Sequence, residues 1–203
     1  MIAIVDYHMG NLASVRNAFD VLGEKVTIES DPEKLSQYDR IILPGVGAFG
    51  DAMDHLKQRG MDEAVCEYAQ SGKYVLGICL GMQLLFDSSE EFGINQGLGL
   101  IPGRVVAFDS SRFHTPLKVP HMGWNRMFTT EHSLFEGLDE AHYLYFVHSY
   151  HALTANAEHT IGKSIYGYEF TSAVANENVM GIQPHPEKSH RNGLSILKNF
   201  IHL

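Results

Sequence analysis

Three side chains in this sequence have the types that covalent catalysis by a thiol requires. Cys79 lies between two nearby glycines, and His185 and Glu187 stand two residues apart near the end of the chain. A thiolate can attack a carbonyl carbon, an imidazole can take the thiol proton, and a carboxylate bound to the other ring nitrogen fixes the tautomer of the imidazole. Together they predict a nucleophile, its base and an orienting group, but they do not name a substrate.

The setting of Cys79 predicts a sharp corner between a strand and a helix. Residues 74–78 form an apolar run typical of a short buried strand, and residues 80–86 have apolar side chains at helical spacing. Gly77 and Gly81 are the very small neighbours that such a corner needs, and the start of a helix favours a thiolate. A cysteine that is merely buried is the alternative, and the paired glycines favour the reactive thiol.

The histidine belongs to a segment in which prolines stand on both sides of it. Prolines hold the chain extended, and residues two apart in extended chain project to the same side, so His185 and Glu187 can lie next to each other. A loop histidine followed by an acidic residue at a helix start is the alternative for this motif alone. Its coexistence with the cysteine corner favours a catalytic triad.

A glycine-rich loop, residues 44–50, follows the third predicted strand. Ligands of parallel α/β sheets bind beyond the carboxyl ends of the strands, so this loop and the cysteine corner should share one rim. Backbone N–H groups there could stabilise the oxyanion of a tetrahedral intermediate. The candidate donors are Gly45, Val46, Gly47 and Leu80. An ordinary glycine turn leading into a helix near residue 51 is the alternative.

The order of apolar and polar segments predicts one α/β domain over residues 1–203, with a mostly parallel, doubly wound sheet. Residues 87–120 are rich in glycine, serine and charge and predict an irregular excursion, with a short candidate strand at 104–108. Later β segments predict an antiparallel addition to the sheet. The predicted strands are 2–6, 26–29, 39–43, 74–78, 144–150, 164–170, 173–175 and 179–182, and the predicted helices are 12–22, one that begins within 30–33, one from about 51, 61–70, 80–86 and 189–201.

Composition narrows the possible partners and cofactors. The net charge of −9 over 203 residues argues against nucleic acid and suits small molecules or a basic protein partner. The twelve histidines show no ligand spacing, so neither a metal site nor any other cofactor is expected, and Cys66 and Cys79 do not form a disulfide framework. With no leader pattern and no long apolar run, a cytoplasmic, soluble protein is expected, with no membrane partner.

Several motifs resemble those of a known family. Three of them are similar to class I, triad-type glutamine amidotransferases: Gly77 to Gln83, Pro44 to Gly47, and His185 to Ser189. Others resemble, within that family, the glutaminase subunits of imidazole glycerol phosphate synthases, which act in histidine biosynthesis: Asp6-Tyr7 with Gly10-Asn11, Gly45 to Phe49, His121 to Asn125, and Phe146 to Tyr150. The resemblance covers essentially the whole chain and implies a flavodoxin-like fold.

The resemblance also implies a reaction. Cys79 would attack the carboxamide carbon of glutamine to form a γ-glutamyl thioester, His185 would protonate the leaving ammonia and later activate water, and Glu187 would orient His185. Gln83 and Glu91 match positions that hold the amino and carboxylate end of glutamine. The strand segment that lines the same pocket in the family corresponds here to His148, Ser149 and Tyr150.

The implied partner is a (β/α)8 cyclase subunit that receives the ammonia, forming a heterodimer. This chain has no phosphate-binding loop for a phosphorylated acceptor, which fits such a division of labour. The family turns the Gly45–Val46 peptide inward only when the cyclase holds its ligand, so the isolated chain should hydrolyse glutamine slowly. His8, where many relatives have glycine, is a departure. The positions that match the subunit contact are Asn11, Trp124, Tyr145 and Lys188, the last of which would pair with an acidic residue of the cyclase.

Two other interpretations stay open at this point. An amidotransferase subunit of the same lineage could serve another acceptor, such as one in a surface-sugar pathway, and active-site residues cannot separate the two. A non-catalytic regulator or holdase could share the cysteine corner, but it would leave Gln83, Glu91 and the motif around His185 without a purpose.

Overall fold

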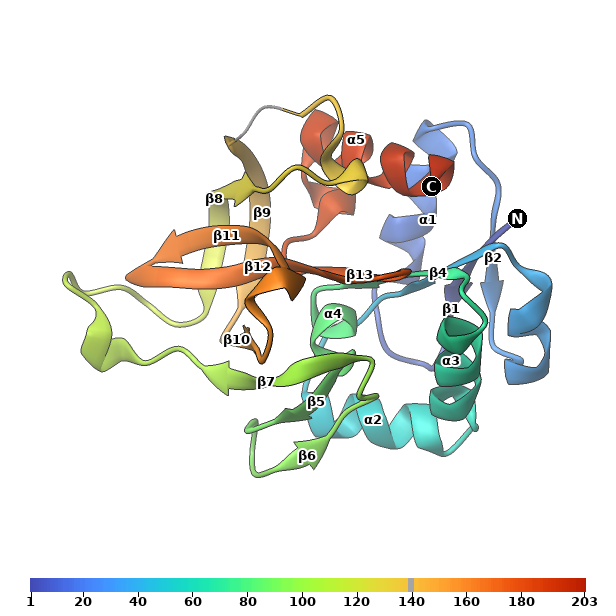
Figure 1. Cartoon of the computed structure of the whole chain (residues 1–203), viewed down its shortest axis with the longest axis horizontal. Coiled ribbons are helices and arrows are strands. Elements are labelled where there is room, and N and C mark those ends of the chain that lie inside the picture. The colour runs from blue at the N-terminus through green and yellow to red at the C-terminus, as the bar shows by residue number, and fades with distance from the viewer. Residues whose placement is uncertain (139–140) are drawn as a thin grey trace.

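The computed structural model describes residues 1–138 and 141–203, and in this part thirteen strands form one sheet with helices on both of its faces (Figure 1). The elements of the first half are β1 (Ile2–Val5), α1 (Leu12–Val21), β2 (Val26–Glu29), η1 (Pro32–Gln37), β3 (Arg40–Leu43), α2 (Phe49–Lys57), α3 (Met61–Gln70), β4 (Tyr74–Ile78) and α4 (Leu80–Leu84). Those of the second half are β5 (Phe86–Ser89), β6 (Asn95–Gln96), β7 (Ile101–Ala107), η2 (Ser110–Arg112), β8 (His121–Thr129), η3 (Ser133–Phe135), β9 (Ala141–His148), β10 (Tyr150–Thr154), η4 (Ala157–His159), β11 (Thr160–Tyr166), β12 (Tyr168–Asn176), β13 (Val179–Ile182), η5 (Pro186–Lys188) and α5 (His190–His202).

The parallel half of the sheet has the strand order β2-β1-β3-β4-β13, and every neighbouring pair in it is parallel. This is the flavodoxin-like order of a doubly wound sheet, as the sequence predicts. The helix start expected within 30–33 is also present, as the short 3-10 helix η1. Asp31 caps it by accepting a hydrogen bond from the N–H of Glu33.

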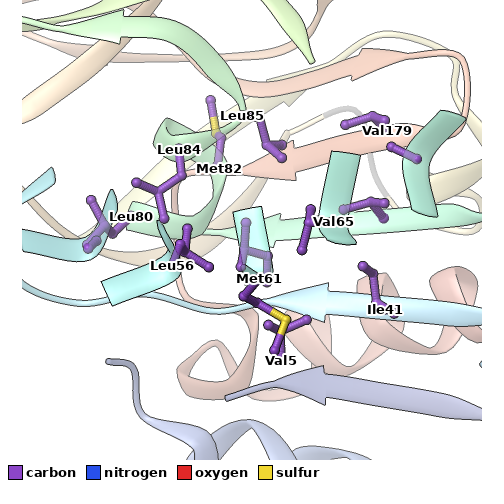
Figure 2. Close-up of a cluster of buried hydrophobic side chains, with 14 of the residues drawn as sticks. Val5, Ile41, Leu56, Met61, Val65, Leu80, Met82, Leu84, Leu85 and Val179 are labelled. Atoms are coloured by element: carbon purple, nitrogen blue, oxygen red, sulfur yellow. The ribbon is translucent and has the colours of Figure 1, made fainter. Parts of the chain in front are cut away.

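Both faces of the parallel strands β1, β3, β4 and β13 are buried, so their side chains divide between two apolar cores. Ile41 and Leu43 of β3 pack with α2, α3 and α4, whereas Ile42 packs with α1 and α5. Figure 1 shows α1 and α5 above the sheet and α2 and α3 below it. Figure 2 shows part of the core on the side of α2 and α3, where Leu56 of α2 and Met61 of α3 pack against the sheet. Continuous apolar runs are typical of parallel strands covered on both sides.

The second half of the chain extends the sheet mainly with antiparallel strands. β12 pairs with β13 and β10, and β10 pairs with β7. A side branch continues from β12 through β11 and β8 to β9. This addition confirms the predicted architecture, but the predicted place of residues 179–182 in it is wrong, because β13 lies parallel to β4 inside the flavodoxin-like core.

Three further local predictions are corrected. Residues 87–120 are not merely irregular, since β6, β7 and most of β5 lie there and join the same sheet. The predicted strand 144–150 is two strands, β9 and β10, which are separated at Ser149. β8, which holds Trp124, is missing from the predicted strands. In each case long-range strand pairing, which no local pattern encodes, decides the structure.

Candidate active site

Cys79 stands at the corner between β4 and α4, where the sequence predicts a nucleophile. Its backbone has φ 55° and ψ −112°, a conformation that costs energy in any residue with a side chain. A Cβ atom at Gly77 would lie 2.7 Å from the N atom of Met82, and one at Gly81 would lie 1.8 Å from the carbonyl oxygen of Leu43. Only glycine fits on either side, so the steric argument for a tight elbow is confirmed.

The pairing of β4 with β13 explains why the second half of the site lies beside this corner. The two strands are parallel and in register, with Ile78 opposite Ile182, so Cys79 and Gln183 leave the sheet side by side. The N–H of Cys79 donates to the carbonyl of Ile182 at 2.8 Å. The segment that follows Gln183 then brings His185 into the same region.

His185 and Glu187 form a buried pair. Nδ1 of His185 lies 2.7 Å from Oε1 of Glu187, and the two side chains are 2% and 1% exposed. The contact is as predicted, but its local geometry is not, because Pro186 starts the 3-10 turn η5 and Glu187 lies in that turn and not in extended chain. The turn also brings the carboxylate of Glu187 within hydrogen-bond distance of the imidazole of His185.

The electrostatic setting of His185 favours its role as a proton acceptor. Burial disfavours the imidazolium, but contacts with Cys79 and Glu187 outweigh burial and raise the pKa of His185 to about 10. The buried Nε2 atom has no hydrogen-bond partner among the described residues. It is therefore available to exchange a proton with the thiol.

Cys79 and His185 line one pocket of about 390 Å³. Most of the residues that the sequence assigns to the site meet in its wall. The lining residues are Val46, Gly47, Cys79, Leu80, Gln83, Glu91, Pro120, Val147, His148, Ser149, Tyr150 and His185. The candidate nucleophile, the candidate base, three of the four candidate oxyanion donors and the candidate substrate-binding residues are thus together. A larger pocket of about 580 Å³ lies elsewhere, around η3.

Gly45 is the one predicted oxyanion residue that does not line the pocket. Gly45 is buried, and a Cβ atom on it would lie 2.9 Å from the N atom of Gly81 and 2.8 Å from the hydroxyl of Tyr7. Gly47 has φ 102°, which favours glycine. The loop is therefore packed tightly against the start of α4, and Leu80 contributes the first N–H of that helix.

Tyr7 and Gln183 support the site, although no role was predicted for either of them. The fully buried hydroxyl of Tyr7 donates to the carbonyl of Pro44 at 2.7 Å, and burial raises the pKa of the phenol, so it stays a donor. The fully buried Gln183 donates from Nε2 to the sulfur of Cys79 at 3.7 Å. Tyr7 stands inside one of the motifs that carry the family resemblance, whereas Gln183 lies two residues before the motif that begins at His185.

Two polar side chains reach the pocket from beyond the nucleophile. Gln83 donates from Nε2 to the carbonyl of Tyr150 at 3.1 Å and to Oε1 of Gln183 at 2.9 Å, so both of its amide hydrogens are used. Oε2 of Glu91 accepts from the N–H of Phe49 at 2.7 Å. Burial raises the pKa of Glu91, while the hydrogen bond from Phe49 lowers it in part.

Three of the four residues predicted at a subunit contact form a cluster outside the pocket lining. Trp124 is 46% exposed on β8 and stacks on His190, with ring centroids 5.1 Å apart. Its ring also meets Tyr145 edge-on at 6.1 Å, and Nζ of Lys188 lies 6.0 Å from the centre of the Tyr145 ring. Asn11 lies at the start of α1, which it caps. Later residues of α1 share a groove with Lys188 and His190.

Two further findings concern the whole of the described chain. Residues 1–138 and 141–203 contain no group of three or more histidine, cysteine, aspartate or glutamate side chains that could hold a metal ion. Within the same ranges, no helix is long and apolar enough to cross a membrane.

Comparison with known proteins decides which family this geometry belongs to. The family model described as glutamine amidotransferase class-I matches residues 3–203. The chain belongs to the class-I glutamine amidotransferases. Within this family, the imidazole glycerol phosphate synthase subunit HisH of Sulfurimonas denitrificans is 72% identical over 200 residues, which cover 98% of this chain and 97% of that protein. The same subunit of Wolinella succinogenes is 57% identical over the full length of both.

Solved structures show the class-I fold at much lower identity. The structure of PurLQS from Thermotoga maritima has a TM-score of 0.77 and 19% identity, and the match covers 99% of this chain and 97% of that one. A crystal structure described as a glutamine amidotransferase also has a TM-score of 0.77, at 16% identity, covering 100% of this chain and 98% of that one. At such identities these likenesses support the fold alone.

Proposed function

We propose that Cys79, His185 and Glu187 are the catalytic triad of a glutaminase and that glutamine occupies the pocket beside them. The thiol gives its proton to His185, and the sulfur attacks the carboxamide carbon of glutamine. The oxyanion that forms is stabilised by the N–H of Leu80 and by the loop at Val46 and Gly47. His185 then gives its proton to the leaving nitrogen, and ammonia departs from a γ-glutamyl thioester.

The second half of the reaction reverses these proton movements. His185 takes a proton from water, the hydroxide attacks the thioester carbon, and the C–S bond breaks to release glutamate. Cys79 regains its proton from His185. Glu187 keeps the imidazole in one tautomer throughout, through the 2.7 Å contact at Nδ1. These steps use no cofactor and no metal ion.

The chain is the glutaminase subunit of an imidazole glycerol phosphate synthase, of the HisH type. The observation that carries this conclusion is the buried triad in a chain 72% identical, over nearly its whole length, to a HisH subunit. A subunit that serves a surface-sugar pathway is not favoured, because both relatives of high identity named above are HisH subunits. We further propose that residues 1–203 act as one domain and that the protein works in the cytoplasm.

The amino end of glutamine is proposed to bind at Gln83 and Glu91. Both amide hydrogens of Gln83 are already donated to protein groups, so its oxygen is what remains for a ligand. The carboxylate of Glu91 is likewise an acceptor. Two acceptors suit the positive α-ammonium group of an amino acid. Backbone groups at His148, Ser149 and Tyr150 would complete the pocket.

The raised pKa of Glu91 predicts that glutamine binding weakens in acid. Because burial raises this pKa, the carboxyl takes up a proton at a higher pH than an ordinary glutamate and then attracts the ammonium less. In the Cys79→Ala variant, which binds without turnover, calorimetry should show the dissociation constant for glutamine rising as the pH falls from about 8 to about 5. Glu91→Gln in that background should bind about tenfold more weakly and lose the pH dependence. An unchanged pH dependence in Glu91→Gln would exclude this role.

We propose that the partner is a (β/α)8 cyclase subunit. It would receive the ammonia and make imidazole glycerol phosphate and aminoimidazole carboxamide ribonucleotide, and the two chains would form a heterodimer. The contact would include Trp124, Tyr145 and Lys188, with Asn11 at the start of α1. An exposed tryptophan beside a tyrosine is typical of the anchors of protein interfaces.

Removal of the exposed tryptophan should weaken the heterodimer. Trp124→Ala loses the ring that covers His190 and Tyr145, and the dissociation constant for the cyclase should rise about 30-fold, as for an interface hot spot. Phe128→Ala is the matched control, since Phe128 also points outward from β8 and is 42% exposed. Its effect should stay within about threefold. Equal losses in the two variants, measured by calorimetry, would place the contact elsewhere.

The experiment that tests the function is a coupled assay. The chain is mixed with its cyclase and the phosphoribulosyl-formimino acceptor, and glutamate formation and acceptor consumption are followed together. We expect the two rates to rise together and to be equal, with slow glutamine hydrolysis by the isolated chain. Rapid hydrolysis without a partner, or hydrolysis that no acceptor accelerates, would contradict the proposed subunit role.

A further inference from the structure

The side chains of Asn125, His121 and His148 form a line of hydrogen bonds from strand β8 to the carbonyl of Tyr150 at the pocket. His121 of β8 faces His148 of β9 across the antiparallel ladder, and Nδ1 of His121 lies 3.0 Å from Nε2 of His148. Nδ2 of Asn125 lies 3.2 Å from Nε2 of His121. Nδ1 of His148 lies 2.7 Å from the carbonyl oxygen of Tyr150, which belongs to the pocket wall.

The direction of every hydrogen bond in this line is fixed by chemistry. A carbonyl only accepts, so Nδ1 of His148 must carry a proton toward Tyr150. A neutral His148 then has a bare Nε2, which must accept from Nδ1–H of His121. The bare Nε2 of His121 in turn accepts from the amide N–H of Asn125. One tautomer of each ring satisfies all three contacts.

The surroundings keep both rings neutral. His121 and His148 are 2% and 6% exposed, and His121 is stacked between Phe146 at 4.8 Å and Tyr166 at 4.1 Å. Burial lowers the pKa of His121 to about 4 and that of His148 to about 3. Burial removes the water that would solvate an imidazolium, so the neutral ring is favoured.

The line continues on the other side of the Tyr150 carbonyl. That oxygen also accepts from Nε2 of Gln83, whose second amide hydrogen goes to Gln183, and Gln183 donates to the sulfur of Cys79. The Tyr150 carbonyl therefore receives two donors, one from the histidine line and one from the pocket. Loss of the first would free the strand end that positions the second.

We propose that His121 and Asn125 are positioning residues for the glutamine pocket, which lock His148 in the Nδ1–H tautomer and thereby hold the Tyr150 carbonyl and Gln83 in place. This inference rests on the proposed glutaminase function. Neither residue touches the pocket itself. Both act through His148.

Two variants test the proposal in the complex with the cyclase. His121→Phe keeps the stacked ring but removes both hydrogen-bonding nitrogens. Asn125→Asp keeps the size of the side chain but replaces its donor with an acceptor, which reverses the direction that His121 requires. Each variant should raise the KM for glutamine about five- to tenfold, with a much smaller change in kcat, because a lost buried hydrogen bond loosens binding groups without removing the triad.

Tyr168→Phe is the matched control. Its hydroxyl binds Nε2 of His151 at 2.9 Å in the same aromatic cluster but outside the line. The KM for glutamine should stay within about twofold of the wild type in this control. Thermal unfolding checks that all three variants are folded. The proposal would be overturned by equal KM values in His121→Phe, Asn125→Asp and Tyr168→Phe.

A second measurement does not depend on glutamine turnover. Nitrogen NMR of the imidazole rings should show His148 as the neutral Nδ1–H tautomer from roughly pH 6 to pH 8 in the wild type, and a change of tautomer or protonation in Asn125→Asp. The Nε2–H tautomer in the wild type would refute the line of hydrogen bonds. If the coupled assay failed while the tautomer was as stated, the proposed function and not the line would be at fault.

Discussion

Cys79→Ala is expected to abolish glutamine hydrolysis, with a loss of about 10⁴-fold or more in the cyclase-stimulated rate. The variant removes the atom that forms the thioester, and neither His185 nor Glu187 can replace it. The change is small, since alanine keeps the Cβ atom of Cys79 and removes only the sulfur. The dissociation constant for the cyclase and the free energy of unfolding should therefore stay close to those of the wild type.

Cys66→Ala provides the matched control for this prediction. Cys66 is the other cysteine of the chain, half-buried on α3, where its sulfur lies 3.6 Å from the carbonyl of Leu98. It does not line the pocket, and its loss should leave the rate within about twofold. Unchanged hydrolysis by Cys79→Ala, measured as glutamate released, would remove Cys79 from the mechanism.

Gly81→Ala is expected to cause the largest loss of stability. The new Cβ would lie 1.8 Å from the carbonyl oxygen of Leu43, so either α4 or the end of β3 must move. Such overpacking against backbone should lower the free energy of unfolding by about 3 kcal/mol or more. Cys79 and Leu80 directly precede Gly81, so a shift of the backbone at Gly81 should displace them. Glutaminase activity should therefore fall as well.

Gly72→Ala is a control that introduces backbone strain without a steric clash of the new Cβ atom. Gly72 has φ 82°, and a Cβ atom there would meet no atom within 4 Å. Its cost should be limited to the left-handed conformation, about 1–2 kcal/mol. Both variants are compared with the wild type by urea unfolding. If Gly81→Ala were as stable as Gly72→Ala, the tight packing of the elbow would not be what requires glycine.

The elbow could be predicted from the sequence because its cause is local. Gly77 and Gly81 flank the cysteine at a spacing that steric exclusion imposes, and the predicted strand 74–78 coincides with β4. The alternation of strands and helices likewise predicts the parallel sheet, since βα units repeat along the first half of the chain. The contact between His185 and Glu187 also followed from short spacing, even though the turn that makes it was not foreseen.

What could not be predicted depends on pairing between distant segments. Residues 179–182 look like one more antiparallel strand, but they insert beside β4, and this register brings Gln183 to Cys79. Tyr7 supports Pro44 only because β1 and β3 are neighbours. The line from Asn125 to Tyr150 exists only because β8 and β9 pair with His121 opposite His148. None of these contacts leaves a periodic trace in the sequence.

The central claim is that the sulfur of Cys79 attacks the carboxamide carbon of a glutamine held in this pocket. It is tested most directly with a glutamine analogue that carries a diazoketone in place of the carboxamide, applied to the chain in complex with its cyclase. Peptide mass spectrometry should find one equivalent of label on Cys79 and none on Cys66, formed in step with the loss of activity and slowed by added glutamine. Complete inactivation with Cys79 unlabelled would contradict the account.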